Sequence, residues 1–243
     1  QYLLCMLKFN DTQLGALVPI SALLEKLEKY QKANEVGNLL KKFDAISVRD
    51  ANSGSIVEQL TGEEPVYNLD PVLTYDYMNC CNRIPQIKAT EKYLILYAYA
   101  GRISHDEADW IAEYAKKKNL KVYAIGGIQK CADRFVDCSP FEVLAYFRNA
   151  EEVITDTFHG SIFSVITHRP FTTLIRKSVG NSYGNEEKLS DLLNRLGLAE
   201  RMTTKVEDTE RINQQPIDYE KVDDVLQKQR EIAKKYLQNN IEG

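Results

Sequence analysis

The chain has 243 residues, of which 44% are hydrophobic and 27% are charged, and its formal net charge at pH 7 is −4. A protein of this length buries one or two cores, and the acidic balance argues against a broad nucleic-acid surface, which needs a clustered basic excess. No apolar run approaches the roughly 18 residues that span a bilayer, and no signal peptide is indicated, so we expect a cytoplasmic protein. The chain begins at Gln1 within a helical pattern, which suggests a fragment.

Residues 1–80 are expected to form a partial N-terminal Rossmann-like domain. The spacing of apolar residues predicts helices around residues 22–27 and 39–43, and short apolar runs predict strands at 45–48 and 66–69. A turn-rich stretch at 50–54 precedes a helix predicted at 55–61. Residues 81–90 carry a proline and little periodicity, which is typical of a linker between domains.

Residues 91–215 are expected to form a second Rossmann-like domain, because strands and helices alternate there. The predicted strands are 93–99, 120–125, 134–136, 153–155 and 171–175, and the predicted helices are 104–118, 139–149, 161–167 and 187–196. Ser104 and Glu107 have the spacing of a capping box that starts the first of these helices. Apolar strands that alternate with helices indicate a parallel sheet covered on both faces, so the fold class is α/β. Residues 216–243 are expected to form a long amphipathic helix.

One strand–helix junction carries the clearest functional signal. Residues 154–161 read Ile-Thr-Asp-Thr-Phe-His-Gly-Ser, and ligands of open α/β sheets bind outside the carboxyl ends of the strands, where helices begin. His159 can exchange a proton near neutral pH, and Gly160 allows a ligand to approach the backbone closely. The alternative is a histidine that only caps or packs a helix.

Three cationic residues follow predicted strands and are candidates for binding an anion. Arg49 could hold a carboxylate or phosphate with two parallel hydrogen bonds, although a surface Arg–Asp pair would leave the same sequence. Arg176 and Lys177 come directly after the strand at 171–175. A solvated basic turn is the alternative for these two.

The ordered motifs resemble those of the polysaccharide pyruvyl transferase family. The resemblance rests on FDAISVRD at 43–50, NLDPVL at 68–73 and VITDTFHGSIFSVITHRPF at 153–171. It implies two Rossmann-like domains that face a cleft, as in GT-B glycosyltransferases, with a final helix that crosses back to the first domain. A glycine-rich Asn-Tyr-Gly segment and a Gly-Ser-Asp stretch, usual in the family, are absent, so the first domain is expected to be incomplete.

The resemblance also implies an activity. The pyruvate unit of phosphoenolpyruvate would be transferred onto two hydroxyls of a sugar, forming a ketal and releasing phosphate, in the biosynthesis of a cell-surface polysaccharide or exopolysaccharide. Arg49 and His159 would be catalytic, with His159 acting as acid or base. Asp156 would belong to the substrate-binding residues, either by orienting the loop or, as we expect, by capping the helix. The donor would be bound by Arg176, Lys177 and the N–H groups of Gly160 and Ser161. Phosphoenolpyruvate is then a substrate, and neither a cofactor nor a metal is expected.

Two other functions stay open at this point. The chain could be a GT-B nucleotide-sugar glycosyltransferase or epimerase, with Glu186 or Glu187 on a ribose, or a sugar-binding relative without catalysis. The expected partners are phosphoenolpyruvate and a sugar or lipid-linked saccharide, and a lipid-linked acceptor would allow peripheral association with a membrane. No nucleic-acid partner is expected. The acceptor sugar, the ketal stereochemistry and the oligomeric state are not determined by the sequence.

Overall fold

The computed structural model describes residues 27–177 and 185–241. The helical pattern at the start of the chain and most of the helix predicted around residues 22–27 lie outside these ranges. The chain divides into two compact units, one comprising residues 1–74 and 227–243 and the other residues 75–226. Within the described ranges, no helix combines the length and the apolar character needed to cross a membrane.

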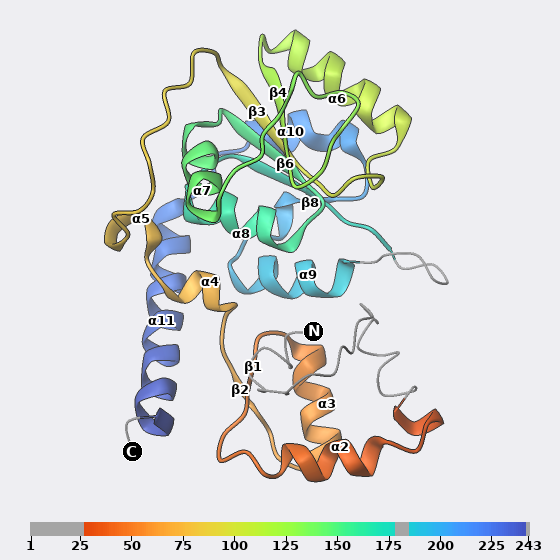
Figure 1. The fold of residues 1–243 in the computed structure, drawn as a ribbon, viewed down its shortest axis with the longest axis vertical. Helices are drawn as coiled ribbons and strands as arrows, with labels where there is room; N and C mark the ends of the chain where they lie inside the picture. The colour runs from red at the N-terminus through yellow and green to blue at the C-terminus, as the bar shows by residue number, and fades with distance from the viewer. Residues whose placement is uncertain (1–26, 178–184, 242–243) are drawn as a thin grey trace. The chain divides into compact units, whose positions relative to one another are not determined.

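The larger unit, residues 75–226, is built on a six-stranded sheet (Figure 1). In chain order its strands are β3 (Tyr93–Tyr97), β4 (Lys121–Ile125), β5 (Arg134–Phe135), β6 (Glu152–Thr155), β7 (Phe171–Leu174) and β8 (Met202–Thr203). They lie in the order β5-β4-β3-β6-β7-β8, and every neighbouring pair is parallel. This order, two halves winding outward from a central strand, is that of a Rossmann fold. The predicted α/β class with a parallel sheet is confirmed.

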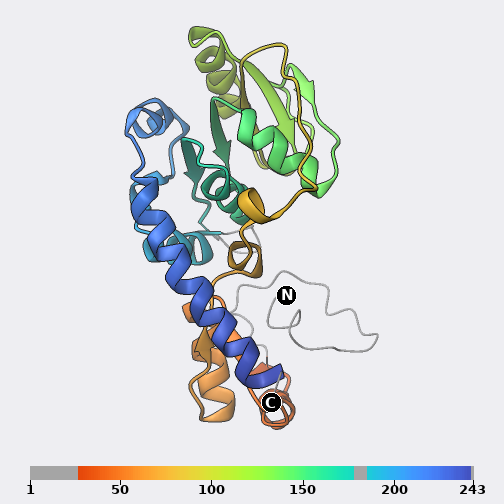
Figure 2. The ribbon, with the colours of Figure 1, turned by 90° about the vertical axis from the view of Figure 1, so that its left-hand side faces the viewer.

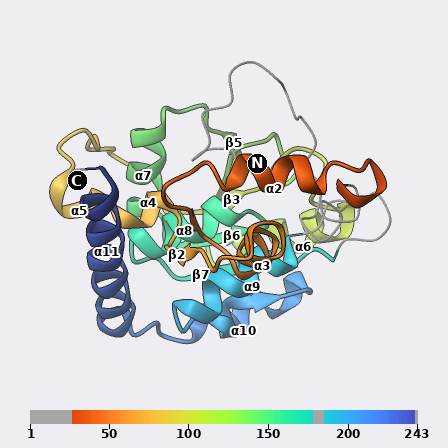
Figure 3. The same ribbon diagram turned by 90° about the horizontal axis from the view of Figure 1, so that it is seen from below.

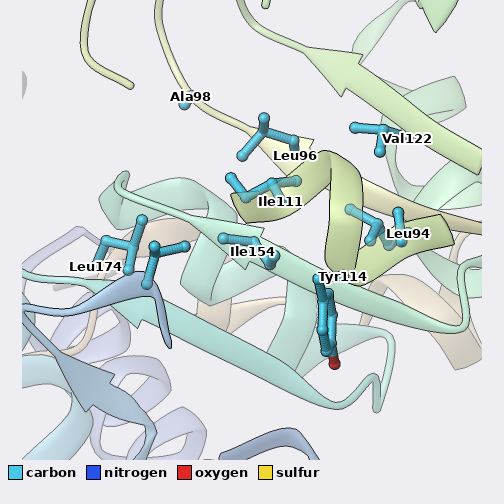
Figure 4. Packing of buried hydrophobic residues seen from close by; sticks show 10 residues of the cluster. Leu94, Leu96, Ala98, Ile111, Tyr114, Val122, Ile154 and Leu174 are labelled. Carbon is cyan, nitrogen blue, oxygen red and sulfur yellow. The ribbon is translucent and has the colours of Figure 1, made fainter. Parts of the chain in front are cut away.

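One face of the sheet packs on helix α6 (His105–Lys117). Successive residues of a strand point to opposite faces, and Leu94 and Leu96 of β3 lie on the α6 side with Ile111 and Tyr114 of the helix (Figure 4). Both leucines are fully buried. Burial of a leucine side chain contributes about 1.5–3 kcal/mol, so β3 is anchored chiefly by its apolar side chains.

The other face packs on helices α7 (Pro140–Asn149) and α8 (Phe158–Ile166). Tyr97 of β3, one residue beyond Leu96, meets Phe147 of α7 and Phe163 of α8 edge to face, with ring centroids 5.7 and 5.9 Å apart. Edge-to-face pairs are a favoured arrangement of buried aromatic rings. This aromatic contact joins α7 and α8 to the centre of the sheet.

The start of α6 follows the predicted capping box. The Ser104 hydroxyl accepts a hydrogen bond from the Glu107 N–H at 3.2 Å, and Glu107 accepts one from the Ser104 N–H at 2.9 Å. Two N–H groups that the helix itself cannot satisfy are thereby paired. The helix ends at Lys117, one residue before the predicted end.

Among its described residues, the smaller unit contains helices α2 (Ala33–Leu40) and α3 (Ala51–Thr61) and a short parallel strand pair. Helix α2 crosses α3, as Figure 3 shows, and strand β1 (Ser47–Val48) pairs with β2 (Val66–Tyr67). Both strands are shorter than predicted. Helix α3 begins four residues earlier than predicted, because the Asp50 carboxylate accepts the Ser53 N–H at 2.8 Å and so caps a helix within the turn-rich stretch.

The last helix, α11 (Tyr219–Ile241), is one long helix (Figure 2). Its residues from Gln227 onward group with the smaller unit, which agrees with the predicted return of the final helix to the first domain. Arg230 on this part donates a hydrogen bond from Nε to the carbonyl of Leu73, at 3.0 Å, at the end of helix α4 (Pro71–Thr74). Ala233 is buried in this part of the helix.

Several short elements of the larger unit escaped prediction. Strand β8 has two residues, and helices α5 (Tyr77–Cys80) and α10 (Thr209–Gln214) have four and six. Segments of this length are too short for hydrophobic periodicity to reveal. Helix α9 (Glu186–Arg195) begins and ends one residue before the predicted helix.

Candidate functional site

The strand order places a switch point between β3 and β6. The chain proceeds from β3 to β4 in one direction along the sheet and from β6 to β7 in the opposite direction. In sheets of this order, ligands bind in the crevice outside the carboxyl ends of the strands at such a point. Tyr97 and Thr155 end the two strands and are partners in register. The segments that follow them therefore flank the candidate site.

The helix after β6 begins earlier than predicted, at Phe158 instead of Ser161. Its N-cap is Thr157, whose hydroxyl accepts a hydrogen bond from the Gly160 N–H at 2.9 Å. The prediction that Asp156 caps this helix is therefore wrong. Thr157 takes the position because its hydroxyl lies within reach of the third N–H of the helix.

His159 lies in the first turn of α8 and is half-buried. Its ring stacks on that of Phe163, one turn further along, with centroids 6.0 Å apart, and meets Phe158 edge to face at 5.8 Å. Neighbours on one face of a helix, such as His159 and Phe163, come into contact by spacing alone. The two rings hold the imidazole at the strand–helix junction next to the switch point.

Gly160 and Ser161 do not present open N–H groups to a ligand. The Gly160 N–H is bound by Thr157, and the Ser161 N–H donates to the carbonyl of Thr157 at 3.3 Å. A Cβ at Gly160 would lie 2.1 Å from Oγ1 of Thr155, so this glycine is needed for packing of the helix on β6 and not for approach of a ligand. The buried Ser161 hydroxyl is bonded to that of Thr173 on β7, at 2.8 Å.

Asp156 is the first residue after β6, and its side chain is fully buried. Neither carboxylate oxygen has a hydrogen-bond partner within the described residues. Burial raises the pKa of this carboxyl to about 6, while the positive charges of Arg102 and Arg176 act in the opposite direction and Glu107 adds to the rise. A buried carboxylate without hydrogen bonds is costly, and such perturbed groups concentrate at functional sites.

Arg176, predicted to bind the donor, is held by a carboxylate of the protein. Its two terminal nitrogens donate to the carboxylate of Glu107, at 2.5 and 3.2 Å, and its Nε lies 3.9 Å from Oδ2 of Asp156. The pKa of Glu107 is lowered, because hydrogen bonds from Arg176 and Ser104 outweigh the effect of burial. Lys177 follows and is exposed.

Asn185 locks the two strand ends together. Its Nδ2 donates to the carbonyl of Asp156 at 2.6 Å, and its Oδ1 accepts the N–H of Arg176 at 2.6 Å. The residue is buried and stands immediately before α9. An asparagine satisfies a carbonyl and an N–H together because its amide carries both a donor and an acceptor.

Arg102 was not singled out from the sequence, although it follows an apolar strand as Arg176 does. It lies beyond β3 on the other side of the switch point, and its guanidinium sits over the ring of Tyr99 at 4.5 Å. Tyr99 is itself 46% exposed. The signal that could have identified Arg102 is its position in the loop between β3 and the Ser104 cap.

Arg49 belongs to the smaller unit and is also paired. Its Nη1 donates to Oδ2 of Asp70 at 2.6 Å, and both side chains are nearly buried. The alternative of a surface ion pair for Arg49 is therefore wrong, because the pair with Asp70 is buried. It joins the FDAISVRD and NLDPVL motifs at the ends of β1 and β2.

Other candidates have peripheral positions. His105 is exposed near Lys130, and His168 bonds to Asp223 at 3.0 Å. Glu186 and Glu187, considered for a ribose, lie exposed in the first turn of α9. No group of three or more histidine, cysteine, aspartate or glutamate side chains that could hold a metal ion occurs in the part of the chain that the structure describes.

The sheet order and the charged groups at its switch point define a Rossmann-like α/β protein with a ligand-side polar cluster. The sequence profile of the polysaccharide pyruvyl transferase family matches residues 2–178, which is most of the chain. The chain therefore belongs to the polysaccharide pyruvyl transferase family. No curated protein matches it in sequence.

Three solved structures similar to the chain match it at low sequence identity. The glycotransferase of kitacinnamycin has 11% identity and a TM-score of 0.43, with 88% of this chain and 64% of that one covered. The O-GlcNAc transferase of Thermobaculum terrenum has 13% identity and a TM-score of 0.42, with 72% of this chain and 38% of that one covered. The wall teichoic acid polymerase TagF has 13% identity and a TM-score of 0.42, with 98% of this chain and 66% of that one covered. The chain thus spans less than two thirds of each of these proteins, and TM-scores below 0.5 do not establish a common fold.

Proposed function

We propose that the protein transfers the pyruvate unit of phosphoenolpyruvate onto two hydroxyls of a sugar, within the biosynthesis of a cell-surface polysaccharide or exopolysaccharide. The observation that carries the proposal is the family match, which includes the His159 junction. The position of that junction, at the switch point of a Rossmann-like sheet, supports it. The proposal includes a cytoplasmic location, because phosphoenolpyruvate is the donor substrate.

The proposed reaction requires two C–O bonds to form and one to break. A proton adds to the methylene carbon of phosphoenolpyruvate, and the two sugar oxygens bond in turn to the neighbouring carbon. That carbon loses its bond to the phosphate oxygen. Of the two protons released by the hydroxyls, one balances the new methyl group and the other leaves with phosphate.

His159 is proposed to carry one of these protons. An imidazole exchanges protons near neutral pH and can act as a general acid or a general base. The packing of its ring between Phe158 and Phe163 fixes its direction, and a fixed direction lowers the entropic cost of proton transfer.

Cationic groups are proposed to bind the phosphate and carboxylate of the donor. Arg102 and Arg176 follow β3 and β7, the strands that flank β6 and the buried Asp156, and exposed Lys177 follows Arg176. Arg176 already neutralises Glu107, so a donor anion would rely more on the exposed Lys177 than the sequence suggested. Arg49 is retained as a proposed catalytic residue, with Asp70 holding its guanidinium in one orientation.

The test is release of phosphate from phosphoenolpyruvate in the presence of lipid-linked and nucleotide-linked sugars, with the product identified by mass. His159→Ala is expected to lower the rate by 100-fold or more, as loss of a general acid or base typically does. His105→Ala is the matched control, since this histidine also lies in the first turn of a helix but is exposed beside Lys130. Equal rates in the two variants would rule out the role given to His159.

Arg49 needs a conservative variant, because Arg49→Ala would leave the buried Asp70 carboxylate without its ion pair. Breaking a buried pair costs about 3–5 kcal/mol, so loss of activity in that variant could reflect unfolding. Arg49→Lys keeps the charge and removes the planar guanidinium. A folded Arg49→Lys protein with unchanged turnover would remove Arg49 from the mechanism.

A further inference from the structure

One aromatic side chain is exposed at the ligand edge of the larger sheet. Tyr99 lies two residues beyond β3, a strand that borders the switch point, and the residue is 46% exposed. Burial of an aromatic side chain is strongly favourable, so an exposed ring gives up part of that free energy. Ligands of such sheets bind outside the carboxyl ends of the strands at a switch point. The ring of Tyr99 is therefore accessible at a place where a ligand is expected.

The backbone of Tyr99 is fixed by the neighbouring loop. Gln129, which follows β4, is buried, and its Nε2 donates to the carbonyls of Ala98 and Tyr99, at 3.0 and 3.3 Å. Gly127 allows the two loops to touch, because a Cβ there would lie 2.3 Å from the backbone nitrogen of Ala100 and 2.8 Å from the carbonyl carbon of Tyr99. Close packing between the loops after β3 and β4 thus sets the position of Tyr99.

The ring of Tyr99 is held as well. The guanidinium of Arg102 lies over the ring, 4.5 Å from its centroid, and the Arg102 N–H donates to the carbonyl of Tyr99 at 3.3 Å. A cation over an aromatic face is attracted to it. Because the guanidinium covers one face, the accessible part of the ring belongs to the opposite face and the edge. A ring that is already ordered loses little entropy when a ligand stacks on it.

The chemistry of an aromatic face selects a ligand with a flat, weakly polar side. The face of a tyrosine ring carries negative charge density, and one face of a pyranose presents C–H groups whose hydrogens are partially positive. Nucleobases also stack on aromatic rings. A nucleotide at a Rossmann sheet, however, has its ribose bound by an acidic side chain about 20 residues beyond the glycine turn. Residues 118–130, at that distance from the turn at Gly101, contain no aspartate or glutamate, which favours a sugar.

We propose that the ring of Tyr99 is a stacking platform for a pyranose ring of the acceptor. This inference rests on the proposed function and deepens it, because it assigns a subsite for the acceptor sugar to the larger unit. Tyr99 is then a binding residue, and proton transfer stays with His159.

The experiment measures the affinity of the whole chain for methyl glycosides of glucose, galactose, mannose and N-acetylglucosamine by saturation-transfer NMR, with and without phosphoenolpyruvate. Tyr99→Leu removes the ring and is expected to weaken binding about five- to tenfold, the size of an aromatic stacking contact. Tyr99→Phe keeps the ring and should bind as the wild type does. In the wild type, the strongest saturation transfer should fall on the C–H hydrogens of one sugar face, and Tyr99→Leu should lose this pattern.

Phe135→Leu is the matched control. Phe135 is also 46% exposed, but it ends β5, the outermost strand of the sheet and two positions away from β3. Its substitution should leave glycoside binding unchanged. Exposed residues away from special features contribute little to stability, and thermal unfolding of the three variants checks that each is folded.

The inference is overturned if the wild type binds none of the four glycosides, if Tyr99→Leu binds them as the wild type does, or if Phe135→Leu loses as much affinity as Tyr99→Leu. Equal losses in Tyr99→Phe and Tyr99→Leu would assign the effect to the hydroxyl and refute stacking. Uridine and adenosine monophosphate are titrated in parallel. A nucleotide that loses affinity in Tyr99→Leu, while glycoside binding is unchanged, would assign the ring to a nucleobase and exclude the sugar subsite.

The inference and the proposed function fail in different ways. Glycoside binding that depends on the ring of Tyr99, without phosphate release from phosphoenolpyruvate under any condition, would refute the proposed function and leave the sugar subsite standing. Phosphate release with sugar affinity independent of Tyr99 would refute the subsite alone.

Discussion

At the scale of single residues, the charged groups at the switch point are more informative than the histidine that marked it. His159 stands out in the sequence because histidine is the residue type whose ordinary pKa lies nearest neutral pH. Asp156 does not stand out in the sequence, because an aspartate before a helix is ordinarily an N-cap. Its complete burial and the effect of Arg102 and Arg176 on its pKa depend on segments that come together only in the folded chain.

The raised pKa of Asp156 predicts a distinct dependence of stability on pH. Between its usual pKa of 3.8 and about 6, the folded chain keeps a proton on Asp156 that the unfolded chain releases. The contribution of this group to the free energy of unfolding therefore falls as pH rises through that window, by about 3 kcal/mol in total. Asp156→Asn removes this dependence.

Urea unfolding of the wild type and Asp156→Asn at several values of pH checks this prediction. Relative to the wild type, the variant should gain about 2–3 kcal/mol between pH 4 and pH 7. Asp109→Asn, at an exposed position on α6, is the control and should not reproduce this gain. A constant difference for Asp156→Asn would mean that its carboxyl titrates normally in the folded chain.

At the scale of elements, the junction of β6 and α8 is set by close packing. Gly160 lies against Thr155. The Thr157 hydroxyl accepts a hydrogen bond from the Gly160 N–H, and the Ser161 hydroxyl is bonded to a side chain of the neighbouring strand β7. A side chain at Gly160 would therefore push the helix, with His159 on it, away from the strand. Functional geometry and packing depend here on the same residue.

Gly160→Ala is expected to destabilise the larger unit by about 1–3 kcal/mol, the usual cost of overpacking. Thermal and urea unfolding would measure the loss. The same substitution is then made in a Thr155→Gly background, where the strand no longer carries the Cβ and hydroxyl that the new methyl group would meet. Gly160→Ala should cost less stability in this background than in the wild type. Equal losses from Gly160→Ala in both backgrounds would show that the contact with Thr155 is unimportant.

The sequence predicted the long elements well and the short ones poorly, for physical reasons. Apolar runs such as that of β3 and the capping box of Ser104 and Glu107 are local signals, and both were confirmed. The predicted start of α8 was wrong, because the sequence alone does not distinguish Thr157 from Asp156 as the N-cap. The contacts of Arg176 were out of reach, because Glu107 is 69 positions away along the chain.

At the scale of the whole molecule, the chain returns to its first unit through α11. Helix residues from Gln227 onward group with residues 1–74, and Ala233 is buried there while its neighbour Lys234 is exposed. This alternation of burial along one helix allows the contribution of the returning segment to be tested with two adjacent substitutions.

Ala233→Asp is expected to destabilise the smaller unit by several kcal/mol, because it places a charge in a buried position. Lys234→Asp changes an exposed residue and should have little effect. Hydrogen exchange measured peptide by peptide should show faster exchange in α2 and α3 for Ala233→Asp only. If both variants exchange like the wild type, the last residues of α11 do not stabilise this unit.

The carboxylate of Glu107 serves two structures at once. One of its oxygens receives the N–H that begins α6, and both receive the guanidinium of Arg176 at the end of β7. An anion that draws Arg176 away would therefore also destabilise the first turn of α6. Conversely, a substitution at Ser104, which does not contact Arg176 in any described interaction, would change the position of Arg176 at the ligand edge of the sheet. Ligand occupancy and the fraying of α6 thus become linked equilibria, so each can be observed through the other.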